Sequence, residues 1–388
     1  MQATSPAASR PLPLTRADFD FHLPADLVAQ APAVRRADAR LMMLARGTSI
    51  LATGDVRTRG TRCVRDEICE YRVADLPDLL DDDPLVVLNE SRVVPSRIVA
   101  SRRSDGRAFE LLVCNPWSRG DSGVRAWVRG ARRLRAGDEL YLADAAGARL
   151  GYRGRDPTDG RICVFEASCA VLCDTLVRSG QIPLPPYISR PDGPTENDRA
   201  RYQTVFASDP GSIAAPTAGL HFDEALLARL DTVQVTLHVG PGTFLPMGEG
   251  DVRAHKVGAE WFRLGEGAAS RIQRAREQGR PILAVGTTVT RVLESVAARH
   301  GGRIVADEGY TDLVIRPGHK WCVVDQLMTN FHLPQSSLLM LTCSFGGRAE
   351  VLAAYAEAVS RRFRFYSYGD CMLIAARPGA AMAPPGGP

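Results

Sequence analysis

The sequence predicts a larger α/β domain into which a small antiparallel β-barrel is inserted. Outside residues 97–167, strand-like and helix-like segments alternate, which is typical of α/β folds. Inside this range, short strand-like runs follow one another, separated by turn signals at Asp105-Gly106, Gly137-Asp138 and Asp159-Gly160. Short strands joined by tight turns favour a small barrel or sandwich.

A chain of 388 residues is longer than one average domain. We assign residues 15–96 and 168–376 to the α/β domain, which the barrel of residues 97–167 interrupts. Residues 1–14 and 377–388 are rich in Pro, Ala and Gly. We expect both of these ends to be disordered.

The first half of the barrel segment is strongly basic. Residues 97–135 contain ten arginines against three acids, a net charge of +7, whereas the whole chain has a net charge of +4. Guanidinium groups bind phosphate and stack on bases, so this stretch favours contact with RNA. The alternative is an arginine-rich surface that only reflects the chain's preference for Arg over Lys. The candidate RNA-binding residues are Arg97, Arg102, Arg103, Arg129, Arg132 and Arg133.

Two histidines stand in loops that could carry proton transfer. His221 follows a run of small residues and precedes Asp223, the expected N-cap of a leucine-rich helix. His332 stands two residues before Pro334. An ordinary His titrates near pH 6.5, so either could act as a base or an acid at neutral pH. A hydrogen-bonded structural role is the alternative for each.

Residues 233–239 alternate apolar and polar side chains and are followed by a Gly-Pro-Gly turn. Period-two geometry places Thr236 and His238 on one face of this predicted strand. Polar residues at the end of an α/β strand often border a ligand crevice, although a solvent-facing edge strand has the same pattern. The candidate ligand-binding residues here are His238, Gly240, Gly242 and Thr243.

The clearest local motif is an apolar strand, Ile282 to Val285, that passes through Gly286-Thr287-Thr288 into a helix pattern from Val289 to Ala298. His300-Gly301-Gly302 ends the helix. A helix N-terminus exposes unpaired amides that suit a carboxylate, ribose or phosphate. The Thr hydroxyls could instead simply cap the helix.

The nine cysteines include no Cys-x-x-Cys pair, and their odd number argues against a closed disulfide framework. No stretch resembles a signal peptide or a membrane span. We therefore expect a cytoplasmic protein without membrane contact. The histidines lack the spacing of metal ligands, so we expect no metal site.

Eight ordered blocks extend across most of the chain. They are FDFHLP (19–24), VLNESRVVPSRI (87–98), GQIPLPPYISRP (180–191), RYQTVFASDPGSIAAPTAGLHFDEALL (201–227), VTLHVGPGTFLPM (235–247), ILAVGTTVTRVLES (282–295), VVDQLMTNFHLPQSSLLML (323–341) and FRFYSYGDCMLI (363–374). Together these blocks resemble the S-adenosylmethionine:tRNA ribosyltransferase-isomerase family of queuosine biosynthesis. The match spans roughly residues 19–374.

The resemblance implies an α/β domain that carries an inserted β-barrel. It also implies that S-adenosylmethionine is a substrate that donates its ribosyl portion, with no permanently bound cofactor. The implied acceptor is 7-aminomethyl-7-deazaguanine at the tRNA wobble position, and the implied products are epoxyqueuosine in tRNA, methionine and adenine. We expect the protein to act as a monomer.

Roles in that reaction follow from chemical type at the matching positions. We expect His221 and His332 to transfer protons, while Asp325, Glu260 and Asp370 steady the sulfonium cation or orient a His. The residues expected to bind the methionyl carboxylate or the ribose hydroxyls are Gly286, Thr287, Thr288 and Arg291.

Several positions depart from the family pattern. Gly258 stands where the second His of a His-x-Met-His-Ser-Glu motif is usual, and Glu90 replaces Asn or Asp. Pro241 replaces Ala, and His319 replaces an aromatic residue. Gly258 and Glu90 keep open the alternative of a diverged relative that uses a small-molecule acceptor. A second alternative is a non-catalytic RNA-binding relative that retains the basic insert.

Overall fold

The computed structural model describes residues 14–46, 68–114, 123–142, 148–244 and 247–376. The predictions of disorder for residues 1–13 and 377–388 lie outside the described residues. Leu14, the last residue of the predicted N-terminal segment, packs against the core, and its carbonyl accepts a hydrogen bond from the Val252 amide at 2.9 Å.

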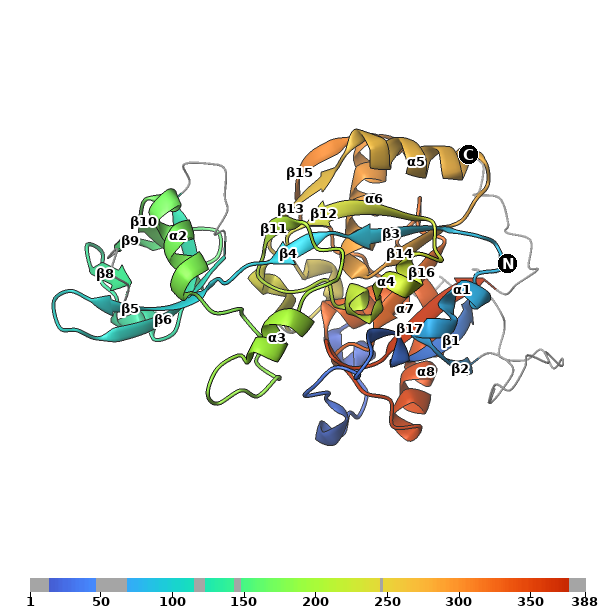
Figure 1. The fold of residues 1–388 in the computed structure, drawn as a ribbon, viewed down its shortest axis with the longest axis horizontal. Helices are drawn as coiled ribbons and strands as arrows, with labels where there is room; N and C mark the ends of the chain where they lie inside the picture. The colour runs from blue at the N-terminus through green and yellow to red at the C-terminus, as the bar shows by residue number, and fades with distance from the viewer. Residues whose placement is uncertain (1–13, 47–67, 115–122, 143–147, 245–246, 377–388) are drawn as a thin grey trace, which may run out of the picture.

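The larger unit is built on a nine-stranded sheet (Figure 1). In order across the sheet the strands are β15 (Asp307–Thr311), β13 (Glu260–Leu264), β12 (Thr232–Leu237), β3 (Leu85–Asn89), β14 (Ile282–Val285), β16 (Gln326–Asn330), β17 (Cys371–Ala376), β1 (Arg40–Arg46) and β2 (Ile68–Arg72). The four middle strands β12, β3, β14 and β16 are parallel, so their carboxyl ends lie at one edge of the sheet. β17 runs antiparallel to β16 and begins at that same edge.

Helices cover both faces of this sheet. The helices of the chain are α1 (Leu76–Leu79), α2 (Cys169–Ser179), α3 (Glu196–Arg201), α4 (Glu224–Leu227), α5 (Glu266–Glu277), α6 (Thr287–Arg299), α7 (Ser337–Gly346) and α8 (Arg348–Ser360). Apolar residues of α5 to α8 pack on the face that includes Ile282 and Ala284. Those of α1 and α4 pack on the opposite face, which includes Leu283 and Val285. The continuous apolar run of β14 is thus buried on both sides, as expected for a central parallel strand.

The helix predicted from Val289 is confirmed as α6, and its C-terminal stop is confirmed as well. The Gly302 amide donates to the Ala297 carbonyl at 2.8 Å, and Gly302 has a positive φ of 87°. The predicted N-cap at Asp223 is also confirmed, because its carboxylate accepts a hydrogen bond from the Leu226 amide at 2.9 Å.

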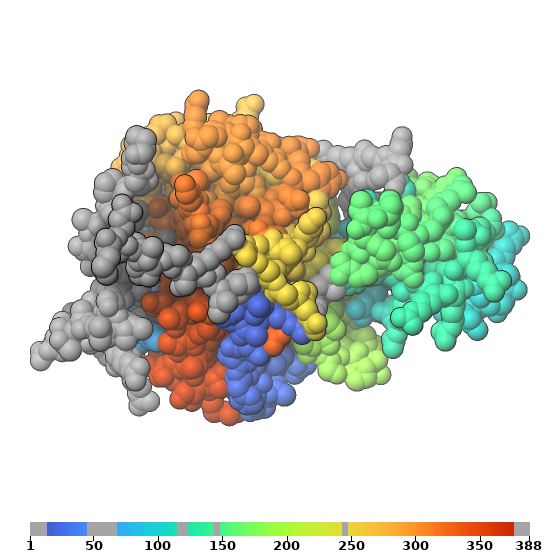
Figure 2. Space-filling model, turned by 180° about the vertical axis from the view of Figure 1, so that it is seen from behind, coloured from blue at the N-terminus to red at the C-terminus, as the bar shows by residue number. Residues whose placement is uncertain are grey.

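Six antiparallel strands close into a separate barrel. They are β5 (Arg97–Arg102), β6 (Ala108–Val113), β7 (Val124–Val128), β8 (Glu139–Leu142), β9 (Arg149–Arg155) and β10 (Ile162–Glu166). Alternate residues of β6, namely Phe109, Leu111 and Val113, point into the barrel core. Figure 1 shows the barrel standing apart from the nine-stranded sheet, and Figure 2 shows it projecting from the larger unit. The predicted fold class, an α/β domain with an inserted barrel, is confirmed.

One boundary differs from the prediction. Helix α2 was assigned to the α/β domain, which we expected to resume at residue 168, but its residues Leu172 and Leu176 belong to the barrel core. The helix packs there because these two side chains, one turn apart, form an apolar face that the small barrel can bury.

The two chain segments that connect the units are held together. Arg97 and Gln181 pair as an antiparallel bridge, with the Gln181 amide donating to the Arg97 carbonyl at 2.8 Å. Gly180 permits this close approach, since a Cβ there would lie 2.5 Å from the carbonyl oxygens of Leu176 and Pro95. The short strands β4 (Ser91–Val93) and β11 (Asp209–Ser212) pair beside this connection.

Seven of the described cysteines form no disulfide: Cys114, Cys163, Cys169, Cys173, Cys322, Cys343 and Cys371. Cys69 on β2 is the exception and is disulfide-bonded. A single bridge agrees with the expectation of no closed disulfide framework, because an odd cysteine count excludes only complete pairing.

Candidate active site

Polar side chains gather where the parallel strands end. Asn89 ends β3, His238 directly follows β12, Gly286 follows β14 and Asn330 ends β16. The start of β17 brings Asp370 to the same edge. Ligands of open α/β sheets bind outside the carboxyl ends of the strands, so this edge is the candidate active site.

Asn89 joins three elements at this edge and is 2% exposed. Its side-chain amide donates to the Leu237 carbonyl at 3.0 Å and to the Thr288 hydroxyl at 3.2 Å, and its Oδ1 accepts from the Ser91 amide at 3.1 Å. Sequence reasoning did not select Asn89. The available signal was a polar residue that ends an otherwise apolar run from Leu85 to Leu88.

The strand-glycine-helix turn predicted at Gly286 is present. Gly286 has a φ of 93° and is the N-cap of α6, without a side-chain hydrogen bond to the first turn. The proposed alternative, that Thr287 and Thr288 merely cap the helix, is therefore wrong. Thr288 instead accepts the hydrogen bond from Asn89. Gly286 lies close to Ala218, whose Cβ would be 3.5 Å from a Cβ added at Gly286.

His238 is held on three sides. Its Nδ1 lies 2.7 Å from the Ser91 hydroxyl, and its ring stacks on Trp261 with the ring centroids 4.8 Å apart. A Cβ added to Gly211 would lie 2.5 Å from Nε2 of His238. The ring is thus fixed in orientation and remains partly exposed.

Glu260 and Arg291 form a buried ion pair at the turn after β12. Glu260 also accepts a hydrogen bond from the Gly240 amide at 2.7 Å, and Nε of Arg291 donates to the Leu313 carbonyl at 3.0 Å. The structure thus joins Glu260, Arg291 and Gly240, three residues selected from the sequence. The side chain of Thr243 lies outside the described residues.

Two further carboxylates lie beside β12. Glu90 accepts hydrogen bonds from the Ser208 hydroxyl at 2.6 Å and the Thr236 hydroxyl at 3.1 Å. Asp209 pairs with Arg263 at 2.7 Å. Within the described part of the chain, Glu90 has no Lys, Arg or His within ion-pair distance. This half of the edge is therefore able to hold a cation.

His221 lies at the other half of the edge and is 4% exposed. Its Nε2 is 3.2 Å from the side-chain nitrogen of Asn330, which also donates to the Tyr366 carbonyl at 3.0 Å. Burial lowers the pKa of His221 to about 4, partly opposed by the negative charge of Asp370. His221 is thus neutral at pH 7 and not poised near neutrality as we expected.

The tautomer of His221 follows from its neighbours. The Tyr366 carbonyl can only accept, so the Asn330 group facing it must be the amide nitrogen. That nitrogen donates to Nε2 of His221. A neutral ring that accepts at Nε2 carries its proton at Nδ1. His221 therefore presents a hydrogen-bond donor.

His332 lies on the other face of the sheet from His221. Its Nε2 is 2.8 Å from the Thr329 hydroxyl, and its amide donates to the hydroxyl of Tyr355 on α8 at 2.9 Å. Asn330, the partner of His221, points to the opposite side, because successive strand residues alternate. Burial lowers the pKa of His332 to about 3.

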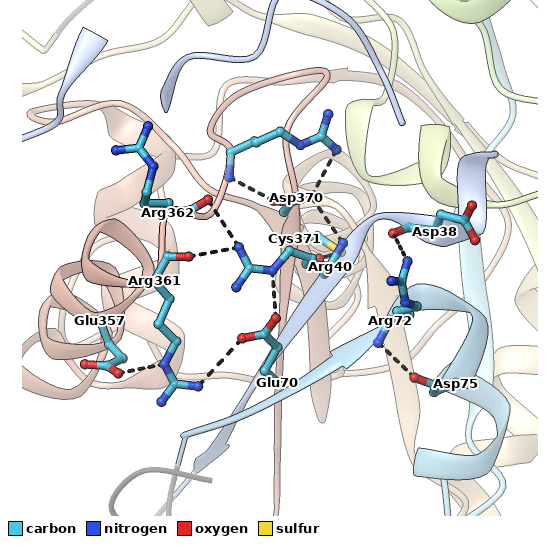
Figure 3. Close-up of polar contacts among 11 residues, drawn as sticks. Asp38, Arg40, Glu70, Arg72, Asp75, Glu357, Arg361, Arg362, Asp370 and Cys371 are labelled. Atoms are coloured by element: carbon cyan, nitrogen blue, oxygen red, sulfur yellow. Dashed lines mark hydrogen bonds and ion pairs between the residues drawn. The ribbon is translucent and has the colours of Figure 1, made fainter. Parts of the chain in front are cut away.

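Asp370 is 1% exposed and accepts hydrogen bonds from the backbone amides of Arg40 at 3.1 Å and Arg364 at 2.8 Å. Figure 3 shows Asp370 where Arg40 and Cys371 meet. The carboxylate stabilises this strand junction and raises the pKa of His221 from nearby. Its influence on His221 is thus electrostatic.

Asp325 lies at the opposite edge of the sheet. It precedes β16, and its carboxylate accepts a hydrogen bond from the amide of Ile282, the first residue of β14, at 2.8 Å. The parallel strands β14 and β16 begin here, whereas Gly286 lies at their other end. The structure therefore does not bring Asp325 to the other candidate residues.

A hollow of about 340 Å³ lies where the barrel meets the larger unit. Arg161 of the barrel lines it together with Gly242, His255, Lys256 and Gly258. A Cβ at Gly258 would meet nothing within 4 Å. The missing second His of the family motif therefore leaves open space beside Gly242.

The barrel arginines fall into two groups. Arg102, 12% exposed, is tied to Asp105 at 2.6 Å and to Asp138 at 2.9 Å. Arg97, Arg103 and Arg129 also have acidic neighbours, at 3.3, 3.3 and 3.7 Å. Arg132 and Arg133 are exposed, and no described carboxylate lies within ion-pair distance of them.

The acids that pair with Arg102 and Arg103 include Asp138 and Glu139, which lie just beyond the basic stretch we counted. Over residues 97–167 the sequence has 14 arginines, no lysine and nine acids, a net charge of +5. The remainder of the chain, with 34 basic and 35 acidic residues, has a net charge of −1. The barrel segment still carries the excess positive charge.

Within the described residues, no set of three or more His, Cys, Asp or Glu side chains is placed to hold a metal ion. Among the helices of the described segments, none is both long and apolar enough to cross a membrane.

The fold and this polar edge define an α/β protein of the kind that binds its ligand at the carboxyl ends of parallel strands and carries a basic barrel beside them. Residues 16–374 match the family model described as queuosine biosynthesis protein. The chain belongs to this family.

Two relatives show how closely the chain follows the family, and one solved structure is also similar to it. A protein of Anaeromyxobacter sp. (strain Fw109-5) named S-adenosylmethionine:tRNA ribosyltransferase-isomerase is 44% identical to this chain, and the match covers 92% of this chain and 98% of the relative. A protein of the same name from Paraburkholderia xenovorans is 41% identical, and the match covers 94% of this chain and 99% of that relative. A crystal structure of S-adenosylmethionine tRNA ribosyltransferase from Thermotoga maritima is 30% identical, covers 92% of this chain and 99% of its own, and has a TM-score of 0.49.

Proposed function

We propose that this chain transfers and isomerises the ribosyl moiety of S-adenosylmethionine onto 7-aminomethyl-7-deazaguanine at the wobble position of tRNA. The products are epoxyqueuosine in tRNA, methionine and adenine. The observation that carries the proposal is a polar sheet edge with an acidic half at Glu90 and a basic half where His221 lies beside Arg36 and Arg201, in a chain whose relatives bear the name of this activity. We propose that it acts as a monomer in the cytoplasm, where tRNA is found.

The reaction needs a site for a cation and a proton acceptor near it. The positive sulfonium makes the adjacent C5′ hydrogens more acidic, so that a base can remove one. The aminomethyl nitrogen then forms the new carbon–nitrogen bond, adenine leaves with a proton, and epoxide closure releases methionine. The sulfonium charge is lost with methionine, so a site for a cation binds the charged substrate in preference to the products.

The acidic half of the edge suits the sulfonium nucleoside. Glu90 offers a carboxylate without a described cationic partner, while Glu260 and Asp209 are neutralised by their own arginines. A cation binds more favourably beside an uncompensated carboxylate than beside an ion pair. We therefore place the sulfonium nearest Glu90.

His238 is the candidate proton acceptor at this half. Ser91 and Trp261 hold its ring, and the ring is partly exposed, so a substrate atom can reach it. A base whose orientation is already fixed loses little conformational entropy in the reaction. The Trp261 ring also offers an aromatic surface on which adenine can stack.

His221 serves the basic half as a hydrogen-bond donor. Its Nε2 is occupied by Asn330, and its low pKa keeps it neutral, so proton abstraction by this ring is disfavoured. Its Nδ1–H is suited to an oxygen or ring nitrogen of the incoming nucleotide. The positions of His332 and Asp325 leave both outside the proposed site.

The test is to incubate the purified protein with S-adenosylmethionine labelled in its adenine and with tRNA that carries the deazaguanine. We expect adenine release only when that tRNA is present. Release without any RNA would indicate a small-molecule acceptor instead. Binding of tRNA without release would indicate a non-catalytic RNA-binding protein.

A further inference from the structure

Two guanidinium groups converge beside His221. Arg36 begins the short helical turn Arg36–Asp38, and Arg201 is the last residue of α3. Together with His221, Ser367 and Tyr368 they line a narrow, partly open hollow of about 10 Å³. Such a space admits about one oxygen atom and is far too small for a nucleobase.

Within the described parts of the chain, the acceptors that Arg36 contacts are all neutral carbonyls. Its Nη1 donates to the Leu220 carbonyl at 3.0 Å, and its Nη2 donates to the carbonyls of Gln203 at 2.8 Å and Ala200 at 3.3 Å. Burial and the positive charge of Arg201 lower the pKa of Arg36. The repulsion between the two groups is therefore part of the native structure.

Arg201 is held in the same way. Its Nη1 donates to the Val34 carbonyl at 3.0 Å and its Nη2 to the Ala33 carbonyl at 2.6 Å. Its Nε is buried and has no hydrogen-bond partner among the described residues. One N–H of this guanidinium thus has no acceptor among the described residues.

Among the described residues, no ion pair neutralises this pair of arginines, although the more distant carboxylate of Asp223 raises the pKa of Arg36 against the larger effects of burial and Arg201. Neither Arg36 nor Arg201 has a described carboxylate within ion-pair distance, whereas Arg190 nearby pairs with Asp198 at 2.7 Å. Partly buried charges are normally paired, because their desolvation is costly. The Nδ1–H of His221 adds a third donor, so the groups around the hollow favour a bound oxyanion.

We propose that Arg36 and Arg201 form a phosphate-binding site for the RNA backbone next to the target nucleotide. This inference rests on the proposed function. The methionyl carboxylate is the other candidate oxyanion, but it belongs to a substrate that also carries an ammonium and a sulfonium and so has a net positive charge. Two arginines repel such a molecule and attract a phosphodiester.

The site would fix the position of the target nucleotide. Phosphate contacts determine the register of a nucleic acid on a protein surface without reading the base. A phosphate held beside His221 keeps the adjoining nucleotide at the basic half of the sheet edge. The acidic half near Glu90 then remains free for the sulfonium nucleoside.

The experiment measures binding of a synthetic anticodon stem-loop RNA at several salt concentrations, and binding of S-adenosylmethionine without RNA by calorimetry. The variants are Arg201→Gln, Arg201→Lys and the control Arg274→Gln, which alters an exposed arginine on α5. Thermal unfolding checks that each variant is folded. Arg201→Gln leaves Arg36 and its three carbonyl contacts unchanged.

For Arg201→Gln we expect roughly tenfold weaker binding of the stem-loop, and a slope of log affinity against log salt that is shallower by about 0.7 to 0.9. Arg201→Lys should keep the slope, since it keeps the charge, and Arg274→Gln should match the wild type. S-adenosylmethionine binding should be unchanged in all of them.

Three outcomes would overturn the site. Unchanged stem-loop affinity in a folded Arg201→Gln variant would mean that the arginine only clamps the loop of Ala33 and Val34. Weaker S-adenosylmethionine binding with an unchanged salt slope would assign the oxyanion to the methionyl carboxylate. A wild-type protein that does not bind the stem-loop at all would reject the proposed tRNA function, and the phosphate site with it.

Discussion

The side-chain amide of Asn330 donates a hydrogen bond to Nε2 of His221 across 3.2 Å. The two residues are 109 positions apart in the chain, and their contact joins the end of β16 to the loop before α4. Because the amide occupies Nε2, the neutral ring carries its proton at Nδ1. This contact makes His221 a neutral hydrogen-bond donor, and we propose that the donor binds the incoming nucleotide, in place of the proton-transfer role that the sequence predicted.

Replacing His221 by Phe should impair the use of tRNA and leave the use of S-adenosylmethionine intact. We expect kcat/KM for tRNA to fall by about tenfold to a hundredfold, as for the loss of a hydrogen-bond donor in a buried site. The KM for S-adenosylmethionine should stay within about twofold. Steady-state kinetics measure both values. His300→Gln, at an exposed His, is the control, and equal losses for both substrates would contradict the donor role.

Buried histidines should make the protein less stable in weak acid. The folded-state pKa values of His221 and His332 are about 4 and about 3, below the ordinary value near 6.5. The unfolded chain therefore binds more protons than the folded chain as the pH falls below 6.5, and stability is lost down to pH 4 to 3. Linkage gives a loss of about 2 kcal/mol per histidine between pH 7 and pH 5.

His332→Gln isolates one half of this effect, because Gln can still contact Thr329 but does not titrate. The free energy of unfolding is measured with urea at pH 7 and at pH 5. The loss of this free energy from pH 7 to pH 5 should be about 2 kcal/mol smaller in the variant than in the wild type. If the variant and the wild type lose the same stability on acidification, His332 does not have the low pKa that its burial implies.

Gly211→Ala should displace the ring of His238 without replacing the histidine itself. The added Cβ would lie 2.5 Å from Nε2 of His238, so the ring must leave its position against Ser91 and Trp261. We expect kcat to fall by roughly a hundredfold, because a misplaced base loses most of its effect. Gly211 has a φ of 155°, so an alanine there also strains the backbone, and Gly154→Ala is the matched control, since Gly154 has a φ of 133° and a Cβ there meets nothing within 4 Å. Normal turnover in Gly211→Ala would remove His238 from the mechanism.

Glu90→Gln should weaken binding of S-adenosylmethionine. The substitution keeps the shape and the acceptor for Ser208 but removes the carboxylate charge that we place beside the sulfonium. We expect the variant to bind S-adenosylmethionine roughly tenfold more weakly than the wild type. Its affinity for the uncharged thioether 5′-methylthioadenosine, which lacks the sulfonium charge and the amino-acid part, should be unchanged. Calorimetry measures the affinity of the wild type and of the variant for each of the two ligands. Equal weakening for both ligands would point to shape and not charge.

The barrel arginines should separate into RNA contacts and structural residues. Replacing Arg132 and Arg133 together by Gln should weaken tRNA binding and reduce the salt slope by up to about two, with little effect on folding. Arg102→Gln should instead lower the midpoint of thermal unfolding, because it breaks the contacts with Asp105 and Asp138. Salt titrations of tRNA binding and thermal scans measure the two effects. Identical behaviour of both variants would refute the division.

Much of the fold could be predicted because its signals are local. The strand, glycine turn and helix from Ile282 to Arg299 follow from the periodicity of neighbouring residues, and so does the change of pattern at Arg97. Helix α2 was misassigned for a different reason. Its apolar face fits either unit, and only packing shows that Leu172 and Leu176 complete the barrel core.

The candidate site was less predictable. Sequence reasoning selected His238, Glu260 and Gly286, which the structure places at one sheet edge, but it also selected Asp325, which lies at the other. Strand direction determines this difference, and direction depends on pairing between distant strands. Asn89 was missed because its role lies in contacts to Leu237 and Thr288, far away in the chain.

From the sequence alone came the family resemblance, the fold class and the chemical types available, because these depend on residue identity and on short-range periodicity. Tertiary structure decided which charges meet. It paired Arg102 with Asp138, left Arg36 and Arg201 together with no described carboxylate within ion-pair distance, and buried His221 deeply enough to lower its pKa. Coulomb energy and desolvation depend on distance and burial in space, which the order of residues along the chain does not specify.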